Sequence, residues 1–352
     1  MINDDIQKQD VGNNSTAYQA NGNITVINQY VLAEEQANKV CKEIVERNII
    51  KFSGEAIKIA EQKFKDFKDI YIGEISKQEE IIVEKITERL KDPSMQYAIF
   101  EAQKGYTKFG NKEKAENLCK LLIEKGKETP GSLMDIIIDD AIVAVAKLNQ
   151  AQIDFLSYLV CKIITVSDIN SINSLYEKHI KDILPYTYTL DLSNSNFEYL
   201  SQIGCITKNH IRTSGNELLS RLKFNYHYIF SKGFTKEEFI QSLNEAYLKY
   251  TSICINNNDL LQINIQTEHD FKNIMKNNNI PNDINQKLWI FFNKIFTDEE
   301  ITQKFCELNS SIGNIINKDQ NLPDISLTPV GTLIAIKNIE LKTGQIIGWD
   351  FN

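Results

Sequence analysis

Apolar residues recur every three or four positions along most of this chain, which is the spacing of amphipathic helices. The pattern runs through residues 32 to 52 and continues through 55 to 90, where it fits either one long helix or two. It stops at Asp92-Pro93, because proline lacks the N–H group that a helix interior needs and disfavours helix in the preceding residue. A mainly α-helical body is therefore predicted from Leu32 onward.

Two later segments, 133 to 148 and 150 to 165, carry apolar residues on more than one face. Helices of this kind are buried on several sides, so these two are predicted to form the centre of the protein. The first of them also carries Asp135, Asp139 and Asp140. Three carboxylates could coordinate a divalent cation, but no His or Glu accompanies them at a recognisable spacing. A solvated or salt-bridged face is the preferred interpretation, and no metal site is predicted.

The C-terminal part alternates between helix and strand signals. Residues 197 to 206 read as a helix that ends at Gly204 and passes into a strand. Near the end of the chain, the strand 325 to 327 precedes Thr328 as a helix N-cap, and Pro329 takes the first helical position. Gly331 is expected to allow close packing against a neighbouring element. A final strand over 345 to 351 completes a small winged-helix-like α/β portion.

Residues 11 to 30 read VGNNSTAYQANGNITVINQY and contain two tandem units of the form G-N-x5-Q. Each unit joins a Gly-Asn turn to β-prone residues, which predicts two short strands. Two strands alone are marginally stable, and open edges with Asn and Gln favour pairing between chains, so the segment is predicted to oligomerise. The alternatives are a polar, disordered tail and docking on the later helices. The predicted oligomerisation residues are Gly12, Asn13, Thr16, Tyr18, Gln19, Gly22, Asn23, Ile24, Val26 and Gln29.

These patterns divide the chain into three parts. Residues 1–31 form the N-terminal β repeat, and residues 32–128 form a helical domain. Residues 129–352 form a helical core with the winged-helix-like C-terminal portion. The second boundary is placed at the turn-forming sequence Thr-Pro-Gly-Ser that begins at position 129.

Charge and cysteine usage indicate the cellular compartment of the protein and the class of its binding partners. The formal net charge of -8 disfavours a general nucleic-acid-binding surface, although Lys208, His210 and Arg212 form a local basic patch that could contact phosphates. Six cysteines without a C-x-x-C pair indicate a reducing compartment. The chain opens without a secretory signal, and its most apolar run is broken by two aspartates. A cytoplasmic protein without constitutive membrane association is expected.

A search for catalytic motifs finds no P-loop, G-x-G-x-x-G, H-E-x-x-H or G-x-S-x-G sequence, and the four histidines are far apart. A nucleophilic pair of Cys205 and His210 is conceivable, but a cysteine after a glycine cap is more often a packing residue. No catalytic residue and no cofactor is predicted. Whether the protein is an enzyme stays open, and the balance favours an assembly or effector protein.

Two segments together resemble a known family. Phe-x-x-Leu-x-x-Ile-Gly-Cys-Ile at 197–206 and Leu-Thr-Pro-x-Gly-x-x-Ile-Ala at 327–335 are similar to signatures of bacterial abortive-infection proteins of the Abi-alpha type. The resemblance covers about residues 133 to 345. The G-N-x5-Q units separately resemble amyloid-like signalling motifs of bacterial and fungal cell-death proteins, except that Ala20-Asn21 separates Gln19 from Gly22 where tighter motifs place one apolar residue.

The resemblance implies a cytoplasmic antiviral-defence or cell-suicide protein, and it supplies no catalytic residues. The most favoured function is phage defence, as an abortive-infection effector or scaffold. A homo-oligomer is expected from the N-terminal segment, and a protein partner or a phage trigger is a further candidate partner. Two alternatives stay open. One is a winged-helix DNA-binding regulator acting through the basic patch at 208 to 212, and the other is a nuclease or hydrolase with an unrecognised site.

Overall fold

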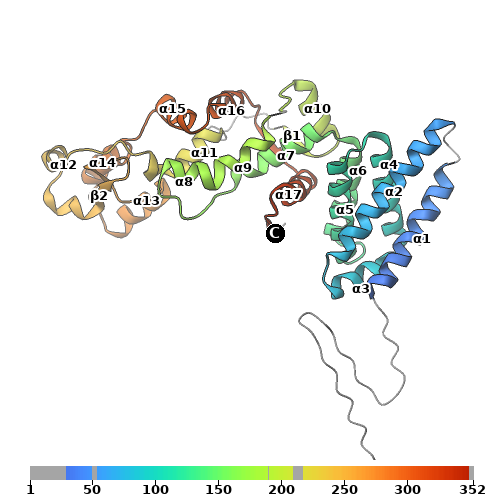
Figure 1. Cartoon of the computed structure of the whole chain (residues 1–352). Helices are drawn as coiled ribbons and strands as arrows, with labels where there is room; N and C mark the ends of the chain where they lie inside the picture. The colour runs from blue at the N-terminus through green and yellow to red at the C-terminus, as the bar shows by residue number, and fades with distance from the viewer. Residues whose placement is uncertain (1–28, 50–53, 189, 209–216, 349–352) are drawn as a thin grey trace, which may run out of the picture. The chain divides into compact units, whose positions relative to one another are not determined.

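The computed structural model describes residues 29–49, 54–188, 190–208 and 217–348, and the chain divides into two compact units (Figure 1). Unit 1 is Met1–Phe100 and unit 2 is Glu101–Asn352, so the division falls within helix α4 (Pro93–Phe109). The sequence analysis instead placed a boundary at 128/129. In the structure that turn joins two helices of unit 2 that pack against each other, α5 (Lys112–Lys127) and α6 (Leu133–Lys147).

Unit 1 is organised around its first helix, which packs on the next two. Each helix buries one face, as the spacing of the apolar residues predicts. Of the two alternatives for residues 55 to 90, the structure has two helices, and the break follows Ser76. The buried residues of α2 are Ala60, Phe64, Phe67, Tyr71 and Ile75. The helices are α1 (Gln29–Ile49), α2 (Glu55–Ser76) and α3 (Glu80–Arg89).

The core of unit 2 is built around α17 (Pro329–Thr343), which packs on α5, α6 and α7 (Gln150–Ile163). The prediction that the helices near 133–165 lie at the centre is confirmed, because every residue of α7 from Gln152 to Lys162 is buried. The helix α17 packs with them and buries consecutive residues that point to different sides, namely Leu333, Ile334, Ala335 and Ile336, together with Ile339. A helix segment that is buried on several sides must be enclosed, and here three other helices contact α17.

A polar side chain at the centre of this core joins three helices. Asn338 of α17 is fully buried and donates to Asp154 Oδ1 at 3.0 Å and to Ser157 Oγ at 2.8 Å, both on α7. Its Oδ1 accepts from Asn117 Nδ2 of α5 at 3.1 Å and from Gln150 Nε2 at 3.2 Å. Because these buried bonds form in one arrangement, they set the register of α17 against its neighbours.

A second hydrophobic cluster lies in unit 2, away from α5 and α6 (Figure 1). The aromatic-rich stretch near Trp289 belongs to this cluster, since Phe291 and Phe292 are among its buried residues. We call this the aromatic cluster; its buried members are Phe234, Phe239, Ile263, Ile265, Phe271, Met275, Leu288, Phe291 and Phe292. It is enclosed by the helices α12 (Lys236–Ser242), α13 (Glu268–Asn277) and α14 (Asn282–Phe292) and the antiparallel strands β2 (Thr251–Cys254) and β3 (Asn257–Ile263).

The remaining elements of unit 2 are short, and their ends follow local capping rules. Thr297 and Glu300 form a capping box with both reciprocal hydrogen bonds at the start of the helix Asp298–Leu308. The helices are α8 (Ile172–Leu175), α9 (Lys181–Ile183), α10 (Asn194–Gln202), α11 (Leu218–Asn225), α15 (Asp298–Leu308) and α16 (Ser311–Gln320). A π-helical turn, η1 (Tyr176–Ile180), and the 3-10 turns η2 (Leu184–Tyr186), η3 (His227–Phe230) and η4 (Glu245–Tyr250) complete the set.

The mainly α fold class is confirmed, and the strands in the described part of the chain form two separate pairs. One pair is β1 (Ile206–Lys208) with β4 (Ile325–Leu327), and the other is β2 with β3. The predicted final strand is not formed over Gln345–Gly348, and residues 349–351 lie outside the described residues. Residues 1–28 of the predicted N-terminal β segment also lie outside them, and for its last three residues, 29–31, the β prediction is wrong because they form the first turn of α1. None of the described helices combines the length and the apolar character needed to cross a membrane.

Acid should destabilise the protein through His179, a buried residue of η1. Burial lowers its pKa from 6.5 to about 4. Between these values the unfolded chain binds a proton that the folded chain does not, so stability is complete above pH 6.5 and falls as the pH drops towards 4. The loss amounts to about 3 kcal/mol. Urea unfolding at pH 8 and at pH 4.5 should show a smaller acid loss for His179→Gln than for the parent.

The exposed His269 provides the control for this measurement. His269→Gln should keep the acid loss of the parent chain. Equal acid losses in all three proteins would contradict a role for His179.

Candidate functional site

The two segments that carry the family resemblance lie side by side in unit 2. Strand β1 (Ile206–Lys208) pairs antiparallel with β4 (Ile325–Leu327), and Ile206 stands opposite Leu327. Each strand is attached to a helix, because β1 follows α10 and β4 precedes α17. We call residues 204–208 and 325–331 together the clasp.

One threonine joins the two halves of the clasp. The Thr328 hydroxyl donates to the Gly204 carbonyl oxygen at 2.6 Å, and the Thr328 N–H donates to the Cys205 carbonyl oxygen at 3.1 Å. The same hydroxyl accepts from the Gly331 N–H at 3.1 Å and so caps α17, as predicted. Gly204 ends the preceding helix with a φ of 83°, which glycine adopts without strain.

Gly331 allows the start of α17 to lie directly against the backbone of Cys205. A Cβ built at this position would lie 1.9 Å from the Cys205 carbonyl oxygen, so a larger residue cannot stand there without a shift. The predicted role of this glycine in close packing is confirmed. Cys205 is itself fully buried, and burial raises the pKa of its thiol to about 12. Because the thiolate is the nucleophilic form, Cys205 acts here as a packing residue.

A pocket of about 380 Å³ opens beside the clasp, lined by β4, by Lys162 of α7 and by Arg221 of α11. Lys162 Nζ donates to Asp319 Oδ1 at 2.7 Å, and the Tyr158 hydroxyl donates to the same oxygen at 2.5 Å. The Leu218 N–H donates to the other carboxylate oxygen of Asp319. This buried charge cluster therefore joins α7, α11 and α16.

The protonation of the cluster follows from its burial. Burial raises the pKa of the Tyr158 hydroxyl, and the nearby Asp319 carboxylate raises it further. Burial also lowers the pKa of Lys162, and Asp319 opposes that shift. Both donors are engaged by one carboxylate, so the arrangement holds helices together and presents an ion pair at the pocket wall. The sequence analysis missed this cluster, since its members are far apart in the chain.

The basic patch predicted for nucleic acid is described at one of its three residues. Lys208 lies in β1 and forms an ion pair with Glu198 at 3.6 Å. His210 and Arg212 lie outside the described residues. Of the predicted oligomerisation residues, only Gln29 is described, and it lies in α1. The others fall outside the described residues.

Two of the three aspartates of α6 form ion pairs with a buried lysine of α5. Lys125 of α5 is fully buried and contacts Asp135 at 2.7 Å and Asp139 at 2.9 Å, whereas Asp140 is exposed. The salt-bridged interpretation is therefore confirmed for two of the three. Within the described ranges no group of three or more His, Cys, Asp and Glu side chains is arranged to hold a metal ion.

The fold and the clasp define a mainly helical protein whose C-terminal helix is anchored by a strand pair. A protein-family model matches residues 32–352, and the chain belongs to that family, whose function is unknown. No curated protein matches the chain. No solved structure matches it either.

Gly331→Ala should destabilise unit 2, because the added methyl group collides with the Cys205 carbonyl. A cost of about 1–3 kcal/mol in the free energy of unfolding is expected, as for overpacked cores. The matched control is Gly73→Ala in α2, where nothing lies within 4 Å of the added Cβ. That control should stabilise its helix by about 0.5–1 kcal/mol. Denaturant unfolding measures both, and an unchanged Gly331→Ala protein would refute the tight contact.

Asp135→Asn should cost about 3 kcal/mol, because it removes the closer charge partner of the fully buried Lys125. Asp140→Asn changes an exposed carboxylate about two turns after the start of the same helix. It should alter the free energy of unfolding by no more than about 0.5 kcal/mol. Thermal and urea unfolding distinguish the two variants. If they prove equally stable, Lys125 is not held by Asp135 in solution.

Proposed function

We propose that this protein is a self-assembling protein of bacterial antiviral defence, acting as an abortive-infection effector or scaffold. The observation that carries the proposal is the clasp. The segments around Gly204 and Gly331 resemble two separate signatures of abortive-infection proteins, and hydrogen bonds through Thr328 join them into one structural unit. Short signatures that coincide by chance have no reason to meet in space, whereas parts of one inherited unit do.

The architecture supports a binding or assembly role. Lys162, Tyr158 and Lys125 each donate to buried carboxylates, so these ionisable groups are committed to holding helices together. In this proposal the winged-helix-like portion of the C-terminal part is the β1–β4 pair together with α10 and α17. Since Lys208 is already paired with Glu198, the observations favour contacts with protein over contacts with phosphate at this strand.

Self-association is proposed to reside in residues 12–28 of the G-N-x5-Q repeat, because its last residue, Gln29, belongs to α1. In this proposal the repeat forms strands that pair between chains, and the helical units are carried by the resulting multimer. The start of α1 sharpens the boundary of the assembly segment. Tyr30 of α1 donates its hydroxyl to the Gln78 carbonyl oxygen at 3.0 Å, so a truncation that removes Tyr30 would also damage unit 1.

Assembly should be lost when charges enter the predicted second strand. In the full-length chain, Ile24→Asp with Val26→Asp should convert a defined multimer into a monomer, because like charges would lie together on every paired edge. Light scattering gives the solution mass. Asn3→Asp with Gln9→Glu adds the same charge outside the repeat and should leave the multimer intact. A parent chain that is already monomeric would overturn the assembly proposal.

The defence role is tested in bacteria that carry the gene and are challenged with a panel of phages. The parent chain should lower plaque formation by at least one phage, and the double aspartate variant should not. Protection that survives in the monomeric variant would leave the defence proposal standing and remove assembly from it. If no phage in the panel is restricted, the defence proposal fails.

A further inference from the structure

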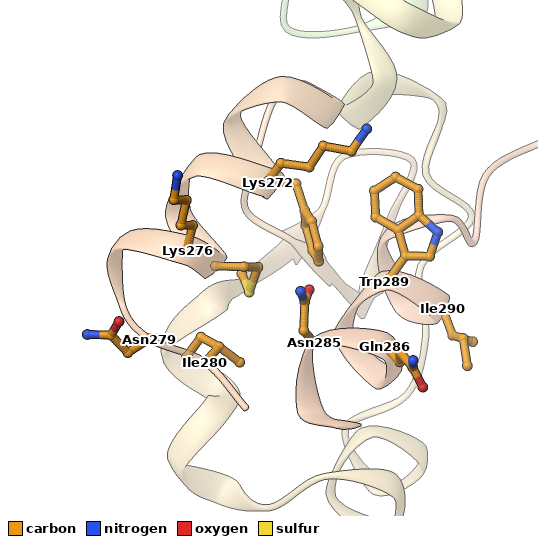
Figure 2. Close-up of a pocket in the computed structure, with 10 residues that line it drawn as sticks. Lys272, Lys276, Asn279, Ile280, Asn285, Gln286, Trp289 and Ile290 are labelled. Carbon is orange, nitrogen blue, oxygen red and sulfur yellow. The ribbon is translucent and has the colours of Figure 1, made fainter. Parts of the chain in front are cut away.

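An open groove of about 760 Å³ runs between α13 and α14 on the surface of the aromatic cluster (Figure 2). Its floor belongs to the core, because Phe271 and Met275 are 2% exposed. Trp289 is half-buried in the wall, and its ring lies 5.2 Å from that of Phe271. Ile290 stands at the edge with 62% of its surface exposed. The groove therefore presents a continuous apolar surface to solvent.

The polar residues at the rim carry one sign of charge. Lys272 and Lys276 lie one turn apart on α13, and the other polar lining residues are the amides Asn279, Asn285 and Gln286 (Figure 2). No acidic residue lines the groove, although the whole chain has a net charge of -8. Lys276 lies in the last turn of α13, where a positive charge is also favourable to the helix dipole.

The two lysines differ in their local partners. Lys272 Nζ pairs with Glu268 at 2.6 Å and lies 6.0 Å from the centre of the Trp289 ring. For Lys276, the described residues supply no ion-pair partner. The rim consequently retains a positive charge next to apolar side chains, and a partner with acidic groups flanking bulky apolar ones would complement both features.

The shape and charge of the groove exclude other common partners. An open groove cannot enclose most of a small molecule's surface, as ligand pockets do. Its walls are two helices whose backbone groups are bonded internally, so an added strand would find no edge to pair with. Two lysines are fewer than the clusters of about four to eight that bind anionic lipid surfaces. An amphipathic helix that lays its apolar face between α13 and α14 satisfies each of these constraints.

We propose that the α13–α14 groove is a docking site for an acidic amphipathic helix of a partner protein. Apolar side chains of the partner fill the space over Phe271, Met275 and Trp289. Acidic side chains that flank them pair with Lys272 and Lys276. This site is independent of the N-terminal repeat and of the antiviral role.

The test uses the full-length chain and a designed peptide. The chain has two tryptophans, so Trp349→Phe leaves Trp289 as the reporter of the groove. The probe is a tryptophan-free peptide of about four helical turns, with leucine at every third or fourth position and glutamate between. Binding should shift Trp289 emission to shorter wavelength with a saturable dependence on peptide. The same peptide with lysine in place of glutamate should bind at least about tenfold more weakly.

Two variants with matched controls assign the binding to the groove. Lys276→Glu should weaken binding about tenfold, whereas Lys236→Glu, at the exposed start of α12, should not. Ile290→Asp should also weaken binding at least tenfold, whereas Ile253→Asp should not, although Ile253 is 64% exposed and belongs to β2. Circular dichroism confirms that all four variants remain folded.

Three outcomes would overturn the proposal. The first is no saturable shift with the acidic peptide. The second is equal binding of the acidic and basic peptides, which would remove the role of the lysine rim. The third is a shift of Trp289 emission with phosphatidylglycerol vesicles and none with the peptide, which would identify a membrane-binding surface instead.

Discussion

The close contact between Gly331 and the Cys205 carbonyl is the constraint on which unit 2 depends. It brings the start of α17 against the end of α10, and Thr328 fixes this approach by bonding to the carbonyls of Gly204 and Cys205. From that anchor α17 extends into the space between α5, α6 and α7. A shift of the anchor by one residue would rotate every side chain of α17 by about 100°, since a helix has 3.6 residues per turn.

Besides this anchor, the interior of unit 2 contains buried polar side chains that hydrogen-bond to one another. Asn338 makes its hydrogen bonds in the C-terminal half of α17, away from the clasp. Asp319 accepts hydrogen bonds from Tyr158 and Lys162 of α7 and from the Leu218 N–H. Apolar packing alone would tolerate several rotations of a helix segment that has apolar residues on several sides. Buried polar bonds penalise each wrong rotation by leaving a donor or acceptor unsatisfied, so they select a single arrangement.

The sequence predicted the features that depend on neighbouring residues. The helical spacing around α6 and α7, the glycine at the end of α10 and the Thr328–Pro329 start of α17 all follow from local rules, and the structure has them. The features that the sequence did not predict join residues that are far apart in the chain. Lys125 cannot be assigned to Asp135, or Lys162 to Asp319, from spacing alone, because the fold decides which helices meet. The boundary at 128/129 differs from the observed division for the same reason: a turn sequence shows where a helix ends and not which helices then pack together.

The clasp also has a consequence for the order of folding. Thr328 and Gly204 are 124 residues apart, and the aromatic cluster lies entirely within that interval. The cluster can collapse while the chain is still being synthesised, whereas α5, α6 and α7 must wait with an uncovered surface until α17 has left the ribosome. A long delay of this kind slows folding and exposes apolar surface in the interim. Nascent chains of this protein are thus expected to depend on chaperones that shield α7, and a chain that terminates before α17 leaves the core of unit 2 unfinished.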